Sequence, residues 1–314
     1  MIKVQDLSKN YGDVQAVKSI DFEIDDGEIV GFLGENGAGK TTTLKMLTGY
    51  LVPTKGNVEI NDLNINDSAL EIQKQIGYLP ELNPLYPEMS VYEYLEFIAR
   101  VRNITGKSFR EALARVVERC GLQGVVHKLV SSCSKGYKQR IGLAGSMIHD
   151  PKILILDEPV TGLDPNQIVE IRELIKSLGR EKLVLMSSHI LQEIQATVDR
   201  IMIIHQGEIV ANGTNEELMS SFKGNTILNL EVRNANENTL KDLSIAVANI
   251  NVVEVNEKKD HHVIQLEYSQ ETDPREDLFN YAVNSDWVIL KMTPTTTDLE
   301  DVFRKLTMEG KADA

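Results

Sequence analysis

The chain has 314 residues, of which 42% are hydrophobic and 25% are charged, so it can form one large globular domain or two smaller ones. Its formal net charge of -14 disfavours a nucleic-acid-binding role, because such proteins usually carry a basic surface. Cys120 and Cys133 are too few for a disulfide framework, so we expect a reducing, cytosolic environment. The first residues do not form a signal peptide, and no run of about eighteen apolar residues occurs, so we expect no membrane-spanning segment.

The chain opens with a pattern typical of short antiparallel strands. Residues 2–24 alternate apolar and polar side chains and are interrupted by a turn at Gly12-Asp13. They lead into the apolar run Ile29–Leu33, which predicts a buried strand. Tyr11 precedes the turn. Such an aromatic is by itself most simply an edge-strand side chain, although its ring could also stack on a nucleotide base.

A glycine-rich loop follows this strand and precedes a helix. Its sequence, GENGAGKTT, fits the phosphate-binding pattern G-x-x-x-x-G-K-T. Glycines let successive backbone N–H groups point into one concavity, and the helix N-terminus adds its positive dipole end. The lysine can reach the outer phosphates, and the first threonine can ligate Mg²⁺. The pattern and its flanks make a turn that binds nothing a weak alternative. The predicted nucleotide-binding residues are Gly34, Asn36, Gly37, Ala38, Gly39, Lys40, Thr41 and Thr42.

Beyond the first helix, the sequence predicts two strands and then a block of helices. The strands are expected at residues 57–60 and 75–81. Apolar residues then follow a helical period from Val91 to Gly121, with Gly106 between two helices. We therefore expect an all-helical insertion at about residues 85–150.

After the insertion, apolar strands alternate with helices. The predicted strands are 153–156, 183–188 and 201–204, the helices between them are 168–178 and 190–198, and Gly207 begins a hairpin. Strands that are apolar throughout and separated by helices indicate a parallel sheet covered on both faces.

Two adjacent carboxylates end the first of these strands. Asp157 and Glu158 follow Ile153–Leu156, and a carboxylate at the carboxyl end of a parallel strand lies beside phosphates bound by a neighbouring loop. Asp157 can hold Mg²⁺, directly or through water. Glu158 can polarise a water molecule for attack on a γ-phosphate. The alternative, a solvated strand end, is weak because the glycine loop upstream requires such a partner.

The composition changes around residues 220–225, and the remaining chain follows the order β-α-β-β-α-β. The strands are predicted at 226–232, 252–255, 262–268 and 287–292, and the helices at 238–248 and 273–284. This order is typical of a ferredoxin-like α+β domain. A last helix is expected from Thr297, where the sequence TDLE has a capping-box pattern. His261-His262 lies at an expected hairpin and lacks further metal ligands, so we expect a solvated turn there. We therefore expect domains at residues 1–220 and 225–310.

The motifs together resemble the ATP-binding subunits of ABC transporters, over roughly the first two-thirds of the chain. The most specific part of the match is the stretch SKGYKQR, which few families share. The resemblance implies a P-loop NTPase core with an antiparallel β subdomain and a helical insertion, ahead of the small ferredoxin-like domain. The residues that carry it are Tyr11, Gly34–Thr42, Ser134–Arg140, Leu154–Pro159, Gly162–Asp164 and His189.

The resemblance implies a role for each remaining motif. Tyr11 would stack on adenine, and His189 would contact the γ-phosphate and hold Glu158 and the attacking water in place. Ser134 and its neighbours Lys135 and Gly136 would bind the ATP held by the opposite subunit of a head-to-tail dimer. Asp164 would lie at the dimer interface.

The sequence departs from the family pattern at two places. Glu81 stands where the family usually has a glutamine that touches Mg²⁺ and faces the membrane partner, and a carboxylate would bind the ion more strongly. The signature stretch has Lys135 where the consensus has glycine, with Cys133 and Tyr137 also unusual. Lys135 could add a cation near the trans phosphate or point into solvent. Neither change removes a group that hydrolysis requires.

Within the family, Tyr78–Glu81 and Leu299–Phe303 resemble the exporter branch that works with ABC-2-type permeases. The likeness is greatest to subunits associated with bacterial gliding motility, and antibiotic-resistance and sodium-efflux ATPases share much of the pattern. We therefore expect an ATP hydrolase that uses ATP and Mg²⁺ as a homodimer, located in the cytoplasm at the inner face of the membrane. A soluble ATP switch acting on ribosomes or DNA is the alternative, and the C-terminal domain is expected to regulate or to dimerise.

Overall fold

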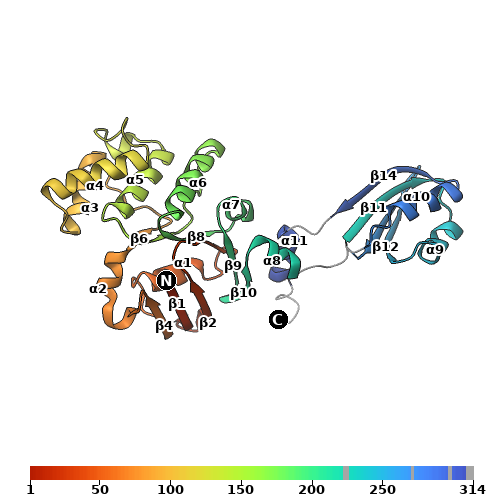
Figure 1. The fold of residues 1–314 in the computed structure, drawn as a ribbon, viewed down its shortest axis with the longest axis horizontal. Helices are drawn as coiled ribbons and strands as arrows, with labels where there is room; N and C mark the ends of the chain where they lie inside the picture. The colour runs from red at the N-terminus through yellow and green to blue at the C-terminus, as the bar shows by residue number, and fades with distance from the viewer. Residues whose placement is uncertain (222–225, 270–271, 296–298, 309–314) are drawn as a thin grey trace. The chain divides into compact units, whose positions relative to one another are not determined.

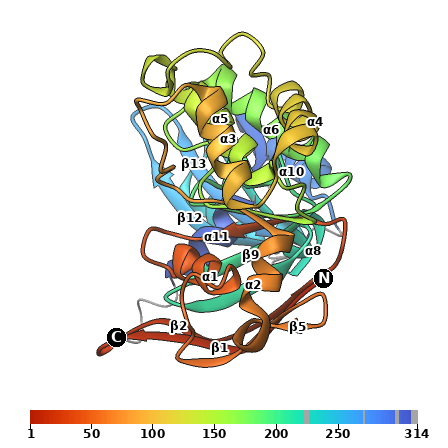
Figure 2. The same cartoon turned by 90° about the vertical axis from the view of Figure 1, so that its left-hand side faces the viewer.

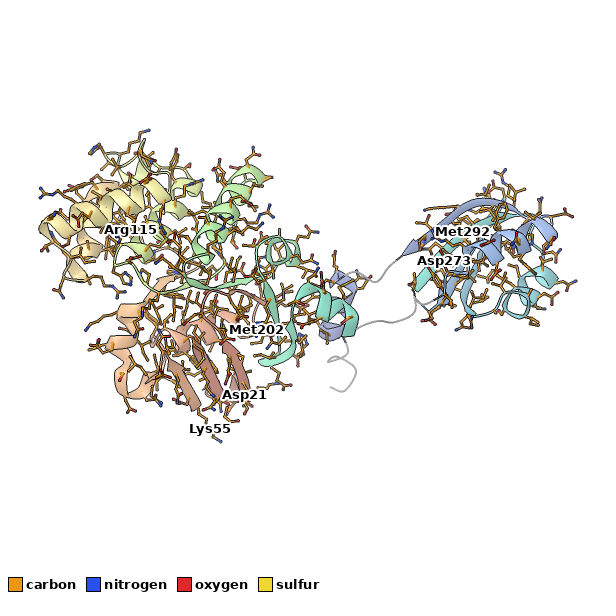
Figure 3. All side chains as sticks on the ribbon, viewed as in Figure 1. Asp21, Lys55, Arg115, Met202, Asp273 and Met292 are labelled. Atoms are coloured by element: carbon orange, nitrogen blue, oxygen red, sulfur yellow. The ribbon has the colours of Figure 1, made fainter. Side chains whose placement is uncertain are left out.

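The computed structural model describes residues 1–221, 226–269, 272–295 and 299–308. The chain divides into two compact units, Met1–Asn215 and Glu216–Ala314 (Figure 1). Each has its own apolar core. Met202 lies in the interior of the first unit, whereas Asp21 and Lys55 lie on its surface (Figure 3). Within the described residues, no helix combines the length and the apolar composition that crossing a bilayer requires.

The first unit begins with an antiparallel sheet in the order β2-β1-β4-β5. Its strands alternate buried and exposed side chains, because one face packs on the core and the other meets solvent. The turn between β4 and β5 uses Asn61 and Asp62, both with positive φ, a conformation that these two residue types tolerate. The strands are β1 (Ile2–Tyr11), β2 (Val14–Ile24), β4 (Lys55–Ile60) and β5 (Leu63–Asn64).

A six-stranded sheet in the order β10-β9-β3-β8-β7-β6 forms the centre of this unit. Five strands are parallel, and β10 joins β9 through the predicted hairpin at Gln206-Gly207. Alternate side chains of the parallel strands, such as Val30 and Phe32, enter the core shared with the antiparallel sheet. The strands are β3 (Ile29–Leu33), β6 (Ile76–Leu79), β7 (Ile153–Leu156), β8 (Leu183–Ser188), β9 (Arg200–His205) and β10 (Glu208–Gly213).

Helices cover this sheet and form the predicted insertion. In Figure 2 the insertion helices α3, α4 and α5 lie together, away from β1 and β2. The helix α2 is not predicted from the sequence; Asn64 caps it through a hydrogen bond from the backbone N–H of Asn66. The helices are α1 (Lys40–Leu47), α2 (Ile65–Gln75), α3 (Val91–Val101), α4 (Gly106–Arg119), the 3₁₀ turn η1 (Val130–Ser132), α5 (Lys135–Met147), α6 (Pro165–Gly179) and α7 (Leu191–Gln195).

The second unit has the predicted ferredoxin-like order. Its antiparallel sheet has the strand order β12-β13-β11-β14. In its core the rings of Trp287 and Tyr281 pack edge to face, with their centroids 5.4 Å apart. The expected cap at Thr297-Asp298 lies outside the described residues. The elements are α8 (Asn215–Ser221), β11 (Thr226–Arg233), α9 (Glu237–Ala246), β12 (Ile250–Glu257), β13 (His262–Tyr268), α10 (Arg275–Asn284), β14 (Val288–Thr295) and α11 (Leu299–Met308).

Candidate functional site

The glycine loop connects β3 to α1 at the carboxyl edge of the parallel sheet. Gly39 has φ 111°, and a Cβ there would lie 2.6 Å from the carbonyl oxygen of Ala16, so both its conformation and its surroundings require glycine. A Cβ on Gly34 would likewise lie 2.5 Å from the carbonyl oxygen of Ile204. Gly39 is the N-cap of α1 and offers no side-chain acceptor to the first turn. The amides of that turn therefore suit an anionic ligand such as a phosphate.

Lys40 reaches from α1 across the loop to Glu158, which follows β7 at the carboxyl edge of the parallel sheet. Its ammonium donates to the carbonyl oxygens of Gly34 at 2.8 Å and Glu35 at 3.2 Å. It also lies 3.4 Å from Glu158 Oε1, and both side chains of this ion pair are about 95% buried. A buried pair of this kind depends on both partners, because removing one leaves an uncompensated charge.

Asp157 is fully buried at the end of β7. Its Oδ1 accepts a hydrogen bond from Ser187 Oγ at 2.6 Å, while Oδ2 has no hydrogen-bond partner within the described residues. Asp157 and Thr41 line one cavity of about 650 Å³. A buried carboxylate oxygen without a protein partner, next to a threonine hydroxyl, fits the oxygen ligands that Mg²⁺ prefers.

Glu158 has a strained backbone and several partners. Its φ of 50° is unusual for a residue other than glycine and costs about 1–3 kcal/mol, so the surroundings must hold it in place. The Glu158 N–H donates to Ser187 Oγ at 3.0 Å. Its Oε2 accepts from Thr161 Oγ1 at 3.0 Å and lies 2.9 Å from His189 Nδ1. The structure thus brings Lys40, Glu158 and His189 together.

Ser187 and Thr161 are residues of this site that the sequence analysis missed. Ser187 is fully buried and binds both the side chain of Asp157 and the backbone of Glu158. A usable signal was present, because Ser187-Ser188 ends a strand that is otherwise apolar. In the structure that strand, β8, runs parallel to β7, with Leu156 opposite Met186, so the residues that follow both strands meet at one edge.

The signature stretch lies at the N-terminus of α5. Ser134 is exposed and caps this helix, its Oγ accepting from the N–H of Tyr137 at 3.3 Å. The side chain of Lys135 lies over Gly162 of the same chain, where an added Cβ would be 1.9 Å from Nζ. Gly136 packs against Gln167 of α6. Lys135 therefore contacts its own chain. The sequence suggested two other arrangements, a cation near the trans phosphate or a side chain that points into solvent.

Three further candidate residues come from the sequence: Asp164, Tyr11 and Glu81. Asp164 caps α6, its Oδ1 accepting from the N–H of Gln167 at 3.0 Å. Tyr11 ends β1 with 49% of its surface exposed, and the ammonium of Lys9 lies 5.5 Å from its ring centroid. Glu81 is exposed after β6.

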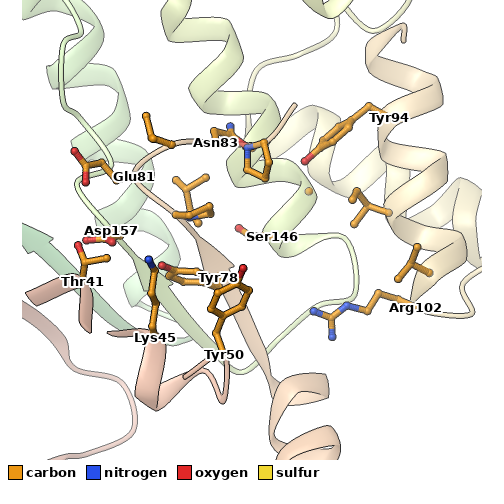
Figure 4. Close-up of a pocket in the computed structure, with 18 residues that line it drawn as sticks. Thr41, Lys45, Tyr50, Tyr78, Glu81, Asn83, Tyr94, Arg102, Ser146 and Asp157 are labelled. Carbon is orange, nitrogen blue, oxygen red and sulfur yellow. The ribbon is translucent and has the colours of Figure 1, made fainter. Parts of the chain in front are cut away.

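The cavity connects Glu81 to Asp157 at the carboxyl edge of the parallel sheet. Figure 4 shows Glu81, Thr41 and Asp157 grouped at one end of this cavity, while Tyr94 and Arg102 of the helical insertion lie at the other. Burial next to Asp157 raises the pKa of Tyr78, which lies between these groups and stays protonated at physiological pH. The cavity thus joins the carboxylate edge of the sheet to the insertion.

Comparison with known proteins agrees with this geometry. The family model described as ABC transporter matches residues 17–161. The bacitracin transport ATP-binding protein BcrA of Bacillus licheniformis is 43% identical over 212 residues, which are 67% of this chain and 68% of that protein. The linearmycin resistance ATP-binding protein LnrL of Bacillus subtilis (strain 168) is 34% identical over 258 residues, 82% of this chain and 83% of that protein.

The fold has a counterpart among solved structures. The dimeric structure of MJ0796, a bacterial ABC transporter cassette, matches with a TM-score of 0.63 and 25% identity over 68% of this chain and 98% of that chain. The sequence-based resemblance is therefore confirmed, and a role on ribosomes or DNA is not favoured. Because relatives that match over two thirds of their length are ABC ATP-binding proteins, this chain belongs to the same family, whose members bind and hydrolyse ATP to drive a membrane transporter.

Proposed function

We propose that the chain hydrolyses ATP as a head-to-tail homodimer and thereby drives export by a separate ABC-2-type permease. The observation that carries this proposal is the buried pair of Lys40 and Glu158 next to the glycine loop, with the more exposed His189 in contact with Glu158. It supplies a cation for the outer phosphates, a carboxylate for the attacking water and an imidazole that touches that carboxylate. The names of the relatives, which include bacitracin transport and linearmycin resistance proteins, favour transport of such compounds as the wider role.

In this mechanism the loop holds the triphosphate. The backbone amides of Gly34–Thr42 and the ammonium of Lys40 bind the β- and γ-phosphates, and Tyr11 stacks on adenine. Thr41 and Asp157 would hold Mg²⁺, with Glu81 at the edge of the same cavity, and the ion would neutralise charge on the phosphates.

Glu158 then accepts a proton from the attacking water while the water oxygen bonds to the γ-phosphorus. The bond to the bridging oxygen breaks, and ADP keeps its electron pair. His189 contacts both the γ-phosphate and Glu158 and keeps the water in line.

A second, exposed group of residues would complete the nucleotide-binding site of the partner subunit. Ser134, Lys135 and Gly136 stand at the N-terminus of α5, where unpaired amides and the helix dipole favour an anion. We propose that they bind the γ-phosphate on the opposite subunit and that Asp164 lies in the interface. Binding of ATP then closes the dimer and hydrolysis releases it. The dimeric form of the MJ0796 cassette supports this arrangement.

The coupling to a membrane partner is proposed at the cavity beside Glu81. It lies between the nucleotide edge and the helical insertion, so closure of the dimer would move both of its walls. The chain would then act in the cytoplasm, bound to its permease at the inner face of the membrane. We further propose that residues 1–220 form the ATP-binding domain and that residues 225–310 form an accessory domain that regulates or dimerises.

The substitution Glu158→Gln tests this function. It keeps the shape of the side chain but removes the base, so we expect ATP turnover to fall at least a hundredfold while an ATP-bound dimer accumulates. Steady-state phosphate release and sedimentation velocity with ATP would measure the two effects. The conservative substitution Glu181→Gln, at an exposed site outside this edge, is the control. Unchanged turnover in Glu158→Gln would refute Glu158 as the base, and a monomer with full activity would refute the dimer.

A further inference from the structure

Ser188 and Glu193 are two buried polar residues that the mechanism above does not use. Ser188 is fully buried at the end of β8, and Glu193 is 7% exposed on the short helix α7. Between them lies the turn that carries His189. Burying a carboxylate costs free energy unless its oxygens are hydrogen-bonded. The buried carboxylate of Glu193, so close to His189, therefore calls for an explanation.

The contacts of Ser188 tie this turn in three directions. Ser188 Oγ donates to Glu193 Oε2 at 2.7 Å and accepts from the N–H of Ile190 at 3.0 Å. The carbonyl oxygen of Ser188 accepts from the N–H of Gly34, the first residue of the phosphate loop, at 3.3 Å. Because His189 lies between Ser188 and Ile190, the hydroxyl bridge fixes the backbone on both sides of the histidine.

Glu193 is itself held firmly. Its carbonyl oxygen accepts from Thr197 Oγ1 at 2.7 Å, which anchors the far end of α7. Burial raises the pKa of the Glu193 carboxyl and the nearby Glu158 adds to the rise, whereas Ser188, His189 and Arg172 oppose it. The bond from Ser188 needs only an acceptor oxygen, which a carboxylate, a carboxylic acid and an amide all provide.

We propose that Ser188 and Glu193 are positioning residues for the ATPase reaction, whose hydrogen bond fixes the turn 188–190 and aims His189 at Glu158. The proposal rests on the proposed function, because it assigns a task only through the role of His189. No relay of protons is involved. The consequence is geometric: without the bridge, the imidazole loses the orientation that places Nδ1 at 2.9 Å from Glu158 Oε2.

The first part of the experiment compares Ser188→Ala, Glu193→Ala and Glu193→Gln in the full chain. Misplacing a catalytic group by about 1 Å can lower a rate up to a hundredfold, so we expect kcat to fall about tenfold or more in both alanine variants. KM for ATP and the Kd of a fluorescent ATP analogue should stay within about twofold, because the phosphate loop is intact. Glu193→Gln keeps the acceptor and should retain most of the activity. Ser177→Ala removes another hydroxyl that donates to a local carbonyl oxygen, away from the site, and serves as the control.

The second part separates positioning from a general loss of structure. In a His189→Ala background, measured in single turnovers, adding Ser188→Ala should lower the rate no further, because the two changes act through one group. If Ser188→Ala and Glu193→Ala keep the wild-type kcat, or if they lower the rate equally with and without His189, the proposal is overturned. If instead Glu158→Gln and His189→Ala leave turnover unchanged, the proposed function itself fails. Melting temperatures identify any variant that is merely unfolded, and the alanine variant that stays folded, compared with Glu193→Gln, then carries the test.

Discussion

The two halves of the proposed nucleotide site differ sharply in how they are built. Lys40, Asp157 and Glu158 are buried, and their positions are determined by hydrogen bonds within one chain. Ser134 and Lys135 are exposed, and the bonds of Ser134 within the chain are those of an ordinary helix cap. The difference favours the proposed dimer, in which one half is complete before any partner arrives and the other half acts only when a second chain supplies a nucleotide.

The largest expected effect concerns the buried half. Lys40→Met should abolish measurable ATP turnover and also destabilise the fold by about 3 kcal/mol, because the Glu158 carboxylate is left buried without its cation. Adding Glu158→Gln should restore most of the stability but none of the activity. Urea unfolding and phosphate release would measure both. A single variant as stable as the wild type would show that the ion pair contributes little.

A change in the exposed half should abolish activity while leaving stability nearly unchanged. Ser134→Trp should stop turnover by blocking the partner's nucleotide, yet lower stability by only about 1 kcal/mol through the lost cap. Mixing it with Lys40→Met should recover activity, because the mixed dimer contains one site with both an intact loop and an intact signature. Recovery should grow with protein concentration. Activity that is absent from the mixture at every concentration would contradict the trans arrangement.

A smaller effect on stability, which depends on pH, is expected from His149, where the helical insertion meets the sheet. Burial, together with the nearby charge of Arg102, lowers the pKa of His149 to about 4, while one ring nitrogen bonds the carbonyl oxygen of Ile76 at 3.0 Å. The unfolded chain binds this proton near pH 6.5 and the folded chain only near pH 4, so the unfolded state binds more protons in between. Stability is therefore fully present above pH 6.5 and is lost as the pH falls towards 4.

Urea unfolding at pH 7 and pH 5 measures this loss. We expect wild type to lose about 1 kcal/mol more than His149→Gln, whose amide cannot gain a proton, after allowing for partial exposure of the ring. Equal losses in the two proteins would mean that other groups dominate the acid response.

The smallest effect is expected at Tyr11. Its ring is half exposed and belongs to no core, so Tyr11→Ala should leave stability unchanged. Loss of one base-stacking contact is worth about 1–3 kcal/mol, so KM for ATP should rise about fivefold or more at constant kcat. Tyr11→Phe keeps the ring and should bind normally. An unchanged KM in Tyr11→Ala would show that Tyr11 is an ordinary edge-strand side chain and does not stack on adenine.

Much of the fold could be predicted because its signals are local. The glycine loop between Ile29–Leu33 and a helix, and the paired acids after Ile153–Leu156, are each defined within about ten residues. The strand His262–Tyr268 has the predicted bounds, and the order of the C-terminal elements is also as predicted. The helix Ile65–Gln75 was missed, because a two-residue strand and polar turn residues directly before it obscured its start.

The sequence by itself determined the phosphate loop, the carboxylates and the order of the elements, since spacing and alternation act over one or two turns of chain. Only the tertiary structure decided that Ser187 binds Asp157 across 30 residues, that Glu193 holds the turn of His189, and that Lys135 lies on Gly162. These contacts depend on which strands pair and in what register, and pairing is settled by burial of the whole core rather than by any short segment.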